Sequence, residues 1–344
     1  MNERDIQDAA TVPAALDLVG MPSVNFRQLR DADDYIGMAA VRSSSIEHDQ
    51  IDLQSAREGI PSVADLALIF PLDEMVGHPD LLIATANEQI IGYAHVCWRW
   101  AEITGDRVYL HLGYVHPKWR GHGVGSVMLH WSHQRIREIA AVDRPEGVMT
   151  FASNASSTEV EASSLLQDNG YTVVRTLTDM VIDLRAPITT PPLPDGIELR
   201  TIDPAHYRTI YDAYKDAVSP MWTTTQVSEA DFCEFVAENF EGEGFDPGLC
   251  LVAWVGDEVV GYVLGRTKLG VGVLGEVGVR RRWQRRGIGR ALLAGSLKVF
   301  QQRGLAKTRL FTDASDGQGA RSLYEQLGFQ EAKQHMLYRQ AFDQ

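Results

Sequence analysis

The chain has 344 residues, of which 44% are hydrophobic, and a net charge of −14 at neutral pH. This length predicts two domains, and the apolar fraction is sufficient for a packed core in each. The acidic balance argues against a nucleic-acid binder, whose domain would be basic, and no apolar run or leader pattern indicates a membrane segment or a secretory signal. The three cysteines are too few and too scattered for a disulfide framework or a zinc knuckle, so we expect a cytoplasmic protein.

After a polar segment at 1–20, an N-terminal domain is expected at 21–187. Its hydrophobic pattern alternates between strand-like and helix-like stretches. The expected order is a strand at 26–29, a helix capped by Asp31, a hairpin at 81–96, a strand ending at Val115, a glycine loop at 119–125 that opens a helix, a strand at 148–153, a helix ending at Gly170 and a strand around Met180.

The stretch "ITTPPLPDG" at 188–196 contains three prolines and is a predicted linker. The C-terminal domain expected at 197–344 then repeats the same order. Its elements are a strand and helix around Asp203, a hairpin at 249–264, a strand at 276–279, a glycine loop at 283–289, a strand at 308–315, a helix ending at Gly328 and a strand around Met336. The chain is therefore a predicted tandem duplication of an α/β unit, each copy a mixed sheet with helices on its faces.

The two glycine loops, "WRGHGVG" and "WQRRGIG", each precede an apolar helical pattern. A helix that begins at such glycines offers free N–H groups and a positive dipole end to an anion. Five arginines at 280–282 and 285–286 add positive charge in the second loop, which predicts a phosphate site. A Walker loop would need Gly-Lys-Ser/Thr, and a dinucleotide fingerprint would need glycine in place of Leu292, so both are excluded.

The spacings Arg120-x-x-Gly123-x-Gly125 and Gln284-x-x-Gly287-x-Gly289 resemble the acetyl-CoA loop of the GNAT N-acetyltransferases, and "SLYEQLGF" at 322–329 is similar to that family's second signature. The two copies resemble the tandem GNAT group that includes mycothiol synthase.

The resemblance implies two GNAT-like domains that use acetyl-CoA as co-substrate. The strand at 276–279 would splay from its neighbour to admit the pantetheine arm, and the loop amides would bind the pyrophosphate. The residues so implied for acetyl-CoA are Val277, Gly278, Val279, Gln284, Arg285, Arg286, Gly287, Ile288, Gly289 and Arg290, with Tyr114, Val115, Arg120, Gly121, His122, Gly123, Val124 and Gly125 in the first copy.

Acetyl transfer to an amine needs a base, because a free alkylamine has a pKa of about 10.4. Glu276 is the candidate base beside the expected gap, and the N–H of Val279 is the candidate oxyanion donor. Tyr324 stands where the family places its general acid. A packed aromatic ring and an ion-paired strand carboxylate are the structural alternatives for Tyr324 and Glu276.

The matching residues of the first copy are Leu112 and Leu166, which cannot transfer protons. The N-terminal domain is therefore predicted to be degenerate and the C-terminal domain to be the catalyst.

Weaker candidates complete the sequence. Ser315 and Asp316 stand near the position of a family asparagine, and Trp222 in "SPMWTTT" is either part of a substrate lid or a buried core residue. No cysteine or carboxylate completes a metal-ligand pattern with the histidines at 111, 116, 122, 130 and 133, so no metal is expected.

The predicted function is acetyl-CoA-dependent acetylation of a primary amine on a small molecule, by direct attack in a ternary complex. Two alternatives stay open: acetylation of an amino-sugar thiol precursor, as in mycothiol synthase, and a non-catalytic acyl-CoA sensor.

Overall fold

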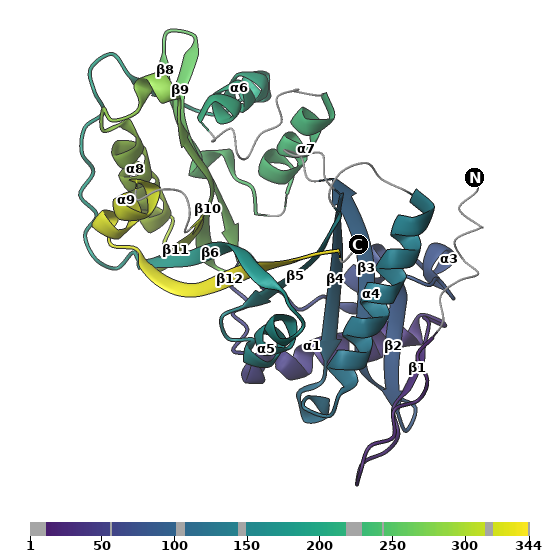
Figure 1. Cartoon of the computed structure of the whole chain (residues 1–344). Helices are drawn as coiled ribbons and strands as arrows, with labels where there is room; N and C mark the ends of the chain where they lie inside the picture. The colour runs from purple at the N-terminus through teal and green to yellow at the C-terminus, as the bar shows by residue number, and fades with distance from the viewer. Residues whose placement is uncertain are drawn as a thin grey trace. The chain divides into compact units, whose positions relative to one another are not determined.

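A computed structural model describes residues 12–55, 57–100, 107–143, 149–217, 229–242, 244–313 and 319–342 (Figure 1). The chain divides into two compact units. Unit 1 comprises Met1–Leu53, Arg57–Arg175 and His335–Gln344, and unit 2 comprises Gln54–Ala56 and Thr176–Gln334. Among the described residues, no helix is long and apolar enough to span a membrane.

Unit 1 is a sheet covered by helices on both faces. Its strands lie in the order β1-β2-β3-β4-β5-β12, with β4 and β5 parallel and the other pairs that β1 to β5 make antiparallel. Residues of α4 pack on one face, and residues of α1 and α2 pack in a separate core. Its elements are β1 (Asn25–Arg27), α1 (Asp33–His48), α2 (Val63–Ile69), α3 (Leu72–Met75), β2 (Leu81–Ala86), β3 (Gln89–Trp100), β4 (Arg107–Val115), α4 (Val124–Asp143), β5 (Met149–Ser156) and α5 (Val160–Asp168).

Unit 2 repeats this plan with strand order β7-β8-β9-β10-β11-β6. Helices α8 and α9 cover one face of the sheet, and α6 and α7 cover the other (Figure 1). Its elements are β6 (Thr172–Asp183), β7 (Glu198–Arg200), α6 (Tyr207–Ala217), α7 (Glu229–Phe240), β8 (Leu251–Val255), β9 (Glu258–Lys268), β10 (Val271–Val279), α8 (Ile288–Gln302), β11 (Lys307–Asp313) and α9 (Gly319–Leu327). The strand β12 (Gln330–Ala341) begins in unit 2 and belongs to unit 1 from His335 onward. The predicted α/β class with a mixed sheet is confirmed.

The closing strands are exchanged between the two sequence halves. Strand β6 pairs with β11, from Lys307↔Asp183 to Asp313↔Leu177, and the end of β12 pairs with β5, including Met336↔Ala155. The boundaries expected at 187 and 197 kept each closing strand in its own half, and here the structure differs. The reason is physical: alternation of apolar residues identifies a strand but does not identify the sheet edge it joins.

A buried ion pair fixes the exchanged strand in unit 2. Arg309 on β11 and Asp179 on β6 are almost completely buried, and their Nη2 and Oδ2 atoms are 2.9 Å apart. Removing one partner of such a pair would leave an uncompensated charge in the core. The pair therefore favours this strand pairing over alternatives that would leave Arg309 or Asp179 unpaired.

The glycines predicted to end helices have the left-handed backbone that this role requires. Gly170, Gly304 and Gly328 have φ angles of 86°, 81° and 100°. The caps at the start of helices are less regular. Asp203 accepts a hydrogen bond from the N–H of Ala205, as predicted, whereas Ala32 and not Asp31 is the N-cap of α1.

Candidate active site

In each unit, the two central parallel strands pair for a short distance and then part. The pairs between β10 and β11 end at Leu274↔Leu310, and those between β4 and β5 end at the matching pair Leu110↔Ala152. Beyond this point β10 continues along β9 to Val279, and β4 continues along β3 to Val115. A gap therefore opens on one side of each strand, where the resemblance implies it.

The backbone register directs hydrogen-bonding groups into this gap. The N–H of Arg280 donates to the carbonyl of Val260 at 3.0 Å, so the alternate residues Gly278 and Glu276 also direct their N–H groups toward β9. The N–H groups of Val277 and Val279 consequently face the gap. In unit 1 the bond from the N–H of His116 to the carbonyl of Ile91, 2.8 Å, fixes the same alternation.

The two glycine loops have the same backbone conformation. Arg285 and Gly287 have φ angles of 60° and 84°, and the matching Gly121 and Gly123 have 75° and 85°. The second residue of each loop also forms a hydrogen bond with the end of the preceding strand.

Gln284 donates through Nε2 to the carbonyl of Val279 at 3.0 Å, and Arg120 donates through Nε to the carbonyl of Val115 at 2.9 Å. These side chains therefore shape the loop, and the loop backbone is left to meet an anion.

The start of α8 has the properties of an anion site. Its N-cap Gly287 provides no side-chain acceptor, and the first helical bond runs from Ala291 to Gly287 at 3.1 Å. The N–H groups of residues 288–290 are thus not used by the helix, whereas Ser62 caps α2 with its hydroxyl. A phosphate at this helix start would receive these donors.

The five arginines predicted to form one phosphate-binding cluster do not all have the same partners. Some form ion pairs with an acidic residue, and others lie at the loop. Arg280 and Arg282 pair with Glu258, on the side of the neighbouring hairpin. Arg286 lies over the ring of Trp283, 4.8 Å from its centre, and Arg285 and Arg290 are exposed at the loop. The interpretation as a phosphate site therefore depends on Arg285, Arg286 and Arg290.

Glu276 and Tyr324, the predicted base and acid, both belong to unit 2. Glu276 is partly exposed on β10, and its pKa is raised to about 7, first by burial and then by Glu238 on α7, against the opposing effect of Arg266. Tyr324 on α9 is almost buried, with its ring edge-on to Phe329. Burial raises the pKa of Tyr262 on β9, and Glu276 and Tyr324 add to this effect. The roles of Glu276 and Tyr324 as base and acid stay predictions.

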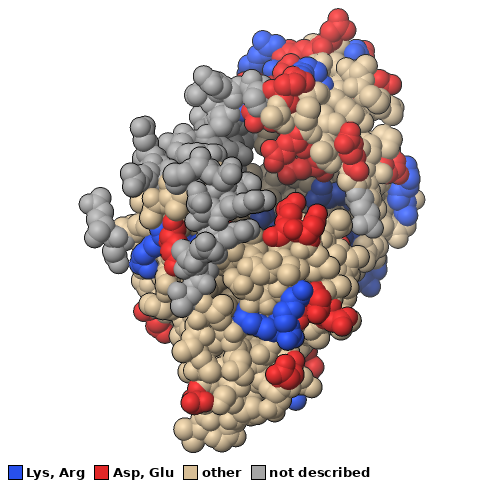
Figure 2. Space-filling model, turned by 90° about the vertical axis from the view of Figure 1, so that its right-hand side faces the viewer, with Lys and Arg blue, Asp and Glu red and all other residues tan. Residues whose placement is uncertain are grey.

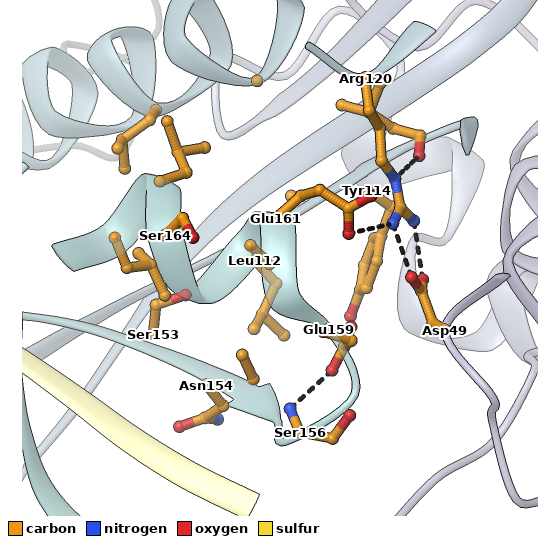
Figure 3. Close-up of a pocket in the computed structure, with 18 of the residues that line it drawn as sticks. Asp49, Leu112, Tyr114, Arg120, Ser153, Asn154, Ser156, Glu159, Glu161 and Ser164 are labelled. Atoms are coloured by element: carbon orange, nitrogen blue, oxygen red, sulfur yellow. Dashed lines mark hydrogen bonds and ion pairs between the residues drawn. The ribbon is translucent and has the colours of Figure 1, made fainter. Parts of the chain in front are cut away.

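Unit 1 contains a cavity of about 790 Å³ between the end of β4, the glycine loop, α5 and β5 (Figure 3). The predicted residues that line it are Tyr114, Val115, Arg120, Gly121, Gly123 and Gly125. His122 and Val124 are not part of the lining. Val124 is fully buried in the core of unit 1, as Ile288 is in unit 2, so for both residues only the backbone is at the loop.

The inner wall of this cavity is apolar where unit 2 has its acid and base. Leu112 and Leu166, which match Glu276 and Tyr324, both line it, and Figure 3 shows Leu112 in the wall. Asn154, which the sequence interpretation missed, also lines the cavity and is exposed at the end of β5. The sequence signal for Asn154 was its position at the end of a strand that precedes a helix. It was missed because the family asparagine was sought only in the second copy.

Two of the histidines considered for metal binding are engaged elsewhere. The Nε2 atoms of His111 and His133 are each 2.6 Å from the hydroxyl of Tyr171. Burial lowers the pKa of His111 to about 3 and that of His133 to about 4, so both rings are neutral at neutral pH. These two rings therefore form a buried hydrogen-bond cluster with one phenol.

Arg120 is held by acidic residues that the sequence interpretation also missed. Its Nη atoms are 2.6 and 2.7 Å from the two carboxylate oxygens of Asp49, and Nη1 is 3.6 Å from Glu161 (Figure 3). In the described part of the chain, His48, Asp49 and Glu161 are the group whose ligand atoms lie within 4.8 Å of one another. Arg120 pairs with Asp49, and His48 contacts Glu161 at 2.7 Å, so these groups are already engaged with one another and carry no metal proposal.

Three predicted features lie outside the described residues: Trp222 with its segment 219–225, Ser315 and Asp316. On the face of the molecule drawn in Figure 2, acidic and basic side chains are interspersed among uncharged ones. Within the described residues of that face, the charge distribution does not form the broad basic surface that nucleic-acid binding requires.

Comparison with known proteins agrees with this geometry. Residues 207–329 match the Acetyltransferase (GNAT) family, and residues 77–173 match the Acetyltransferase (GNAT) domain. The chain belongs to the GNAT acetyltransferases, with two GNAT domains in tandem. Each match contains one parted strand pair and one glycine loop, and the chain is accordingly an N-acetyltransferase.

Its similar relatives include proteins that align with most of this chain and of their own length. The mycothiol acetyltransferase of Salinispora tropica is 29% identical over 75% of this chain and 80% of the relative, and that of Arthrobacter sp. is 28% identical over 89% and 91%. A GCN5-related N-acetyltransferase from Sphaerobacter thermophilus superimposes with a TM-score of 0.70 at 26% identity, covering 92% of this chain and 95% of that one.

Arg285 provides a test of the loop. A residue other than glycine in the left-handed region costs about 1 kcal/mol, and the matching residue of unit 1 is Gly121. Arg285→Gly is expected to raise the free energy of unfolding by about that amount and to weaken CoA binding, because the guanidinium is lost. Denaturant titration and calorimetric titration with CoA measure the two effects.

Arg285→Ala is the matched control, since it removes the same charge but keeps the backbone strain. It should weaken CoA binding as much as Arg285→Gly does and give no gain in stability. Undiminished CoA affinity in both variants would show that Arg285 does not contact the phosphate.

Proposed function

We propose that unit 2 transfers the acetyl group of acetyl-CoA to a primary amine of a small molecule. The observation that supports this most directly is the continuity of β10 with the glycine loop: the N–H groups of alternate β10 residues face a gap, and the strand leads into the uncapped start of α8. Glu276 lies on the same strand, and Tyr324 packs in the core under α8. The loop at 284–290 would bind the pyrophosphate, and the gap would take the pantetheine arm, whose amides can pair with the free groups of β10.

The chemistry follows from these positions. The amine nitrogen attacks the thioester carbon, so that a C–N bond forms and the C–S bond breaks. Val279 donates its N–H to the carbonyl oxygen as negative charge develops there. Glu276 accepts the proton of the amine, directly or through a water molecule, and Tyr324 returns a proton to the thiolate that leaves.

For unit 1 we propose binding of CoA or an acyl-CoA without turnover. Its cavity contains the gap, the loop and the left-handed glycines, but leucines stand at the acid and base positions. The non-catalytic alternative raised by the sequence thus applies to this unit alone.

The relatives provide a second candidate for the acceptor. The two that are compared above are named mycothiol acetyltransferases and align with most of this chain. An amino-sugar thiol precursor is therefore the specific alternative to a simpler primary amine, and a competition assay between the two acceptors would distinguish them.

The two loops are predicted to be unequal. Gly289→Glu introduces a carboxylate between Val279 and Leu323, which are the nearest side chains to a Cβ at this position, and should abolish acetyl transfer because the anion site would carry negative charge. The matched variant Gly125→Glu should leave most activity intact. Steady-state rates and CoA stoichiometry by calorimetry measure this, with melting temperatures as the folding control, and the reverse pattern would place the active site in unit 1.

The raised pKa of Glu276 predicts the pH dependence. As a base it acts only when ionised, so kcat/KM should rise with pH through about 7, and Glu276→Gln should remove that limb and lower the rate by roughly 10²- to 10⁴-fold. The effect of this carboxyl on the stability of the fold has the opposite pH dependence. A carboxyl whose pKa is raised on folding stabilises the fold below its unfolded pKa of about 4.5 and loses that contribution as the pH rises through about 7.

Denaturant titrations at pH 5 and pH 8 check this second effect. The Gln variant should gain stability relative to the wild type between the two values. A pH profile that keeps its limb in the Gln variant would assign the base to another group.

Tyr324→Phe keeps the ring and removes the hydroxyl. If Tyr324 protonates the leaving thiolate, the rate should fall by roughly 10²- to 10⁴-fold, with acetyl-CoA affinity and melting temperature almost unchanged. A merely packed ring predicts the contrary, namely near-wild-type turnover of Tyr324→Phe and a loss of about 3 to 5 kcal/mol in Tyr324→Ala. Pre-steady-state measurement of thiol release separates the two results.

A further inference from the structure

The hydroxyl of Tyr262 on β9 is a buried polar group that the mechanism above does not use. The side chain of Tyr262 has no exposed surface, and its oxygen has no hydrogen-bond partner in the part of the chain that the structure describes. Leaving a hydroxyl unpaired in the interior is costly, so such a group in a native protein requires a reason. A bound molecule that supplies the missing partner is one.

The ring of Tyr262 lies across β10 at Gly278. The two residues are register partners, and a Cβ at Gly278 would overlap the ring and hydroxyl of Tyr262. Glycine at this position is therefore what lets the phenol reach over the strand. Gly278 lies beyond Leu274, the last residue of β10 that pairs with β11, so the hydroxyl lies beside the gap.

Its surroundings keep this hydroxyl protonated. Burial raises the pKa of Tyr262 well above its ordinary value, and Glu276, Tyr214 and Tyr324 raise it further against the opposing effect of Arg280. The phenol is consequently neutral, and a neutral phenol has one hydrogen to donate. The donor thus lies over Gly278, two residues after the proposed base Glu276 on the same strand.

Unit 1 provides a natural comparison at the same register. There Tyr93 is opposite Tyr114, with ring centres 5.0 Å apart, and the guanidinium of Arg42 lies 3.9 Å from the centre of the Tyr114 ring. The side chain of Tyr114 thus occupies the position at which unit 2 has Gly278. The hydroxyl of Tyr93 is not among the buried unpaired groups of the described residues, so the orphan phenol occurs in the unit that has the acid and base.

The position relative to Glu276 indicates which substrate the hydroxyl meets. Glu276 and Gly278 are two residues apart on one strand, so they present the same face. The side chains of Val277 and Val279 pack with the core under α8, which leaves Glu276 and Gly278 on the face covered by α6 and α7. An amine at Glu276 would direct its neighbouring atoms toward the hydroxyl of Tyr262, which covers Gly278, whereas the thioester would lie in the gap.

We propose that Tyr262 is a substrate-positioning residue whose hydroxyl donates a hydrogen bond to an oxygen on the carbon next to the amine-bearing carbon of the acceptor. The acceptor class is then a 2-amino alcohol or a related amine with a neighbouring hydroxyl, ether or carbonyl oxygen. This inference rests on the proposed function of unit 2 and specifies its substrate class.

The test compares 2-aminoethanol with propylamine, which carry the same charge and nearly the same volume and differ in one oxygen. Wild-type protein should acetylate 2-aminoethanol with the higher kcat/KM. Tyr262→Phe should lower that value by roughly 10- to 100-fold, the effect of losing a buried hydrogen bond, and leave propylamine within about threefold. Tyr93→Phe, the register-matched control in unit 1, should change neither.

Thermal unfolding of the protein without substrate provides a second measurement, which does not depend on catalytic activity. Since the hydroxyl has no partner there, Tyr262→Phe should keep the melting temperature or raise it by roughly 2 to 4 °C. A lower melting temperature would show a structural hydrogen bond and overturn the inference.

The kinetic outcomes separate the two levels of the proposal. An active wild type whose preference for 2-aminoethanol is unchanged in Tyr262→Phe overturns this inference alone. A wild type that acetylates neither amine nor any other acceptor overturns the proposed function and this inference with it.

Discussion

The short parallel pairing between the two central strands is the constraint on which both sites depend. After Leu274 in unit 2 and Leu110 in unit 1, one strand loses a neighbour while its other edge stays paired. Alternate backbone N–H groups are then left with an open side, and a ligand with its own amides and carbonyls can complete the ladder. The strand leads directly into the glycine loop and the helix start, so the anion site and the open ladder are fixed by one continuous stretch of backbone.

The strand exchange explains why a unit without acid or base remains part of the molecule. The sheet of unit 2 is completed by β6, which precedes the linker in sequence, and the buried pair Asp179–Arg309 holds it there. Residues 197–344 alone would lack this strand, leaving Arg309 without its partner and the core under α9 open. The first half of the chain thus contributes a strand to unit 2, whatever ligand the cavity of unit 1 binds.

Features with a local cause could be predicted from the sequence, and features that join distant segments could not. The glycines at 170 and 328, the hairpins and the start of α8 follow from short-range backbone preferences and apolar periodicity. Three other features depend on which distant segments pack together. They are the strand exchange, the ion pair between Asp49 and Arg120, and the ion pairs of Arg280 and Arg282 with Glu258. Tyr262 was missed for the same reason, since its significance arises from the glycine opposite it in the neighbouring strand.

At matched positions, unit 2 has residues that disfavour folding and unit 1 has residues that do not. Unit 2 holds Arg285 in a left-handed conformation, a partly buried carboxylate at Glu276 and an unpaired phenol at Tyr262, and each of these choices opposes folding. Unit 1 has Gly121, Leu112 and the packed pair Tyr93–Tyr114 at the corresponding places, each of which removes that cost. Unfavourable choices persist where function requires them and are lost where it does not. All three lie in unit 2, on β9, β10 or the loop that follows β10, and they favour the proposal that this unit is the site of chemistry independently of which groups act as acid and base.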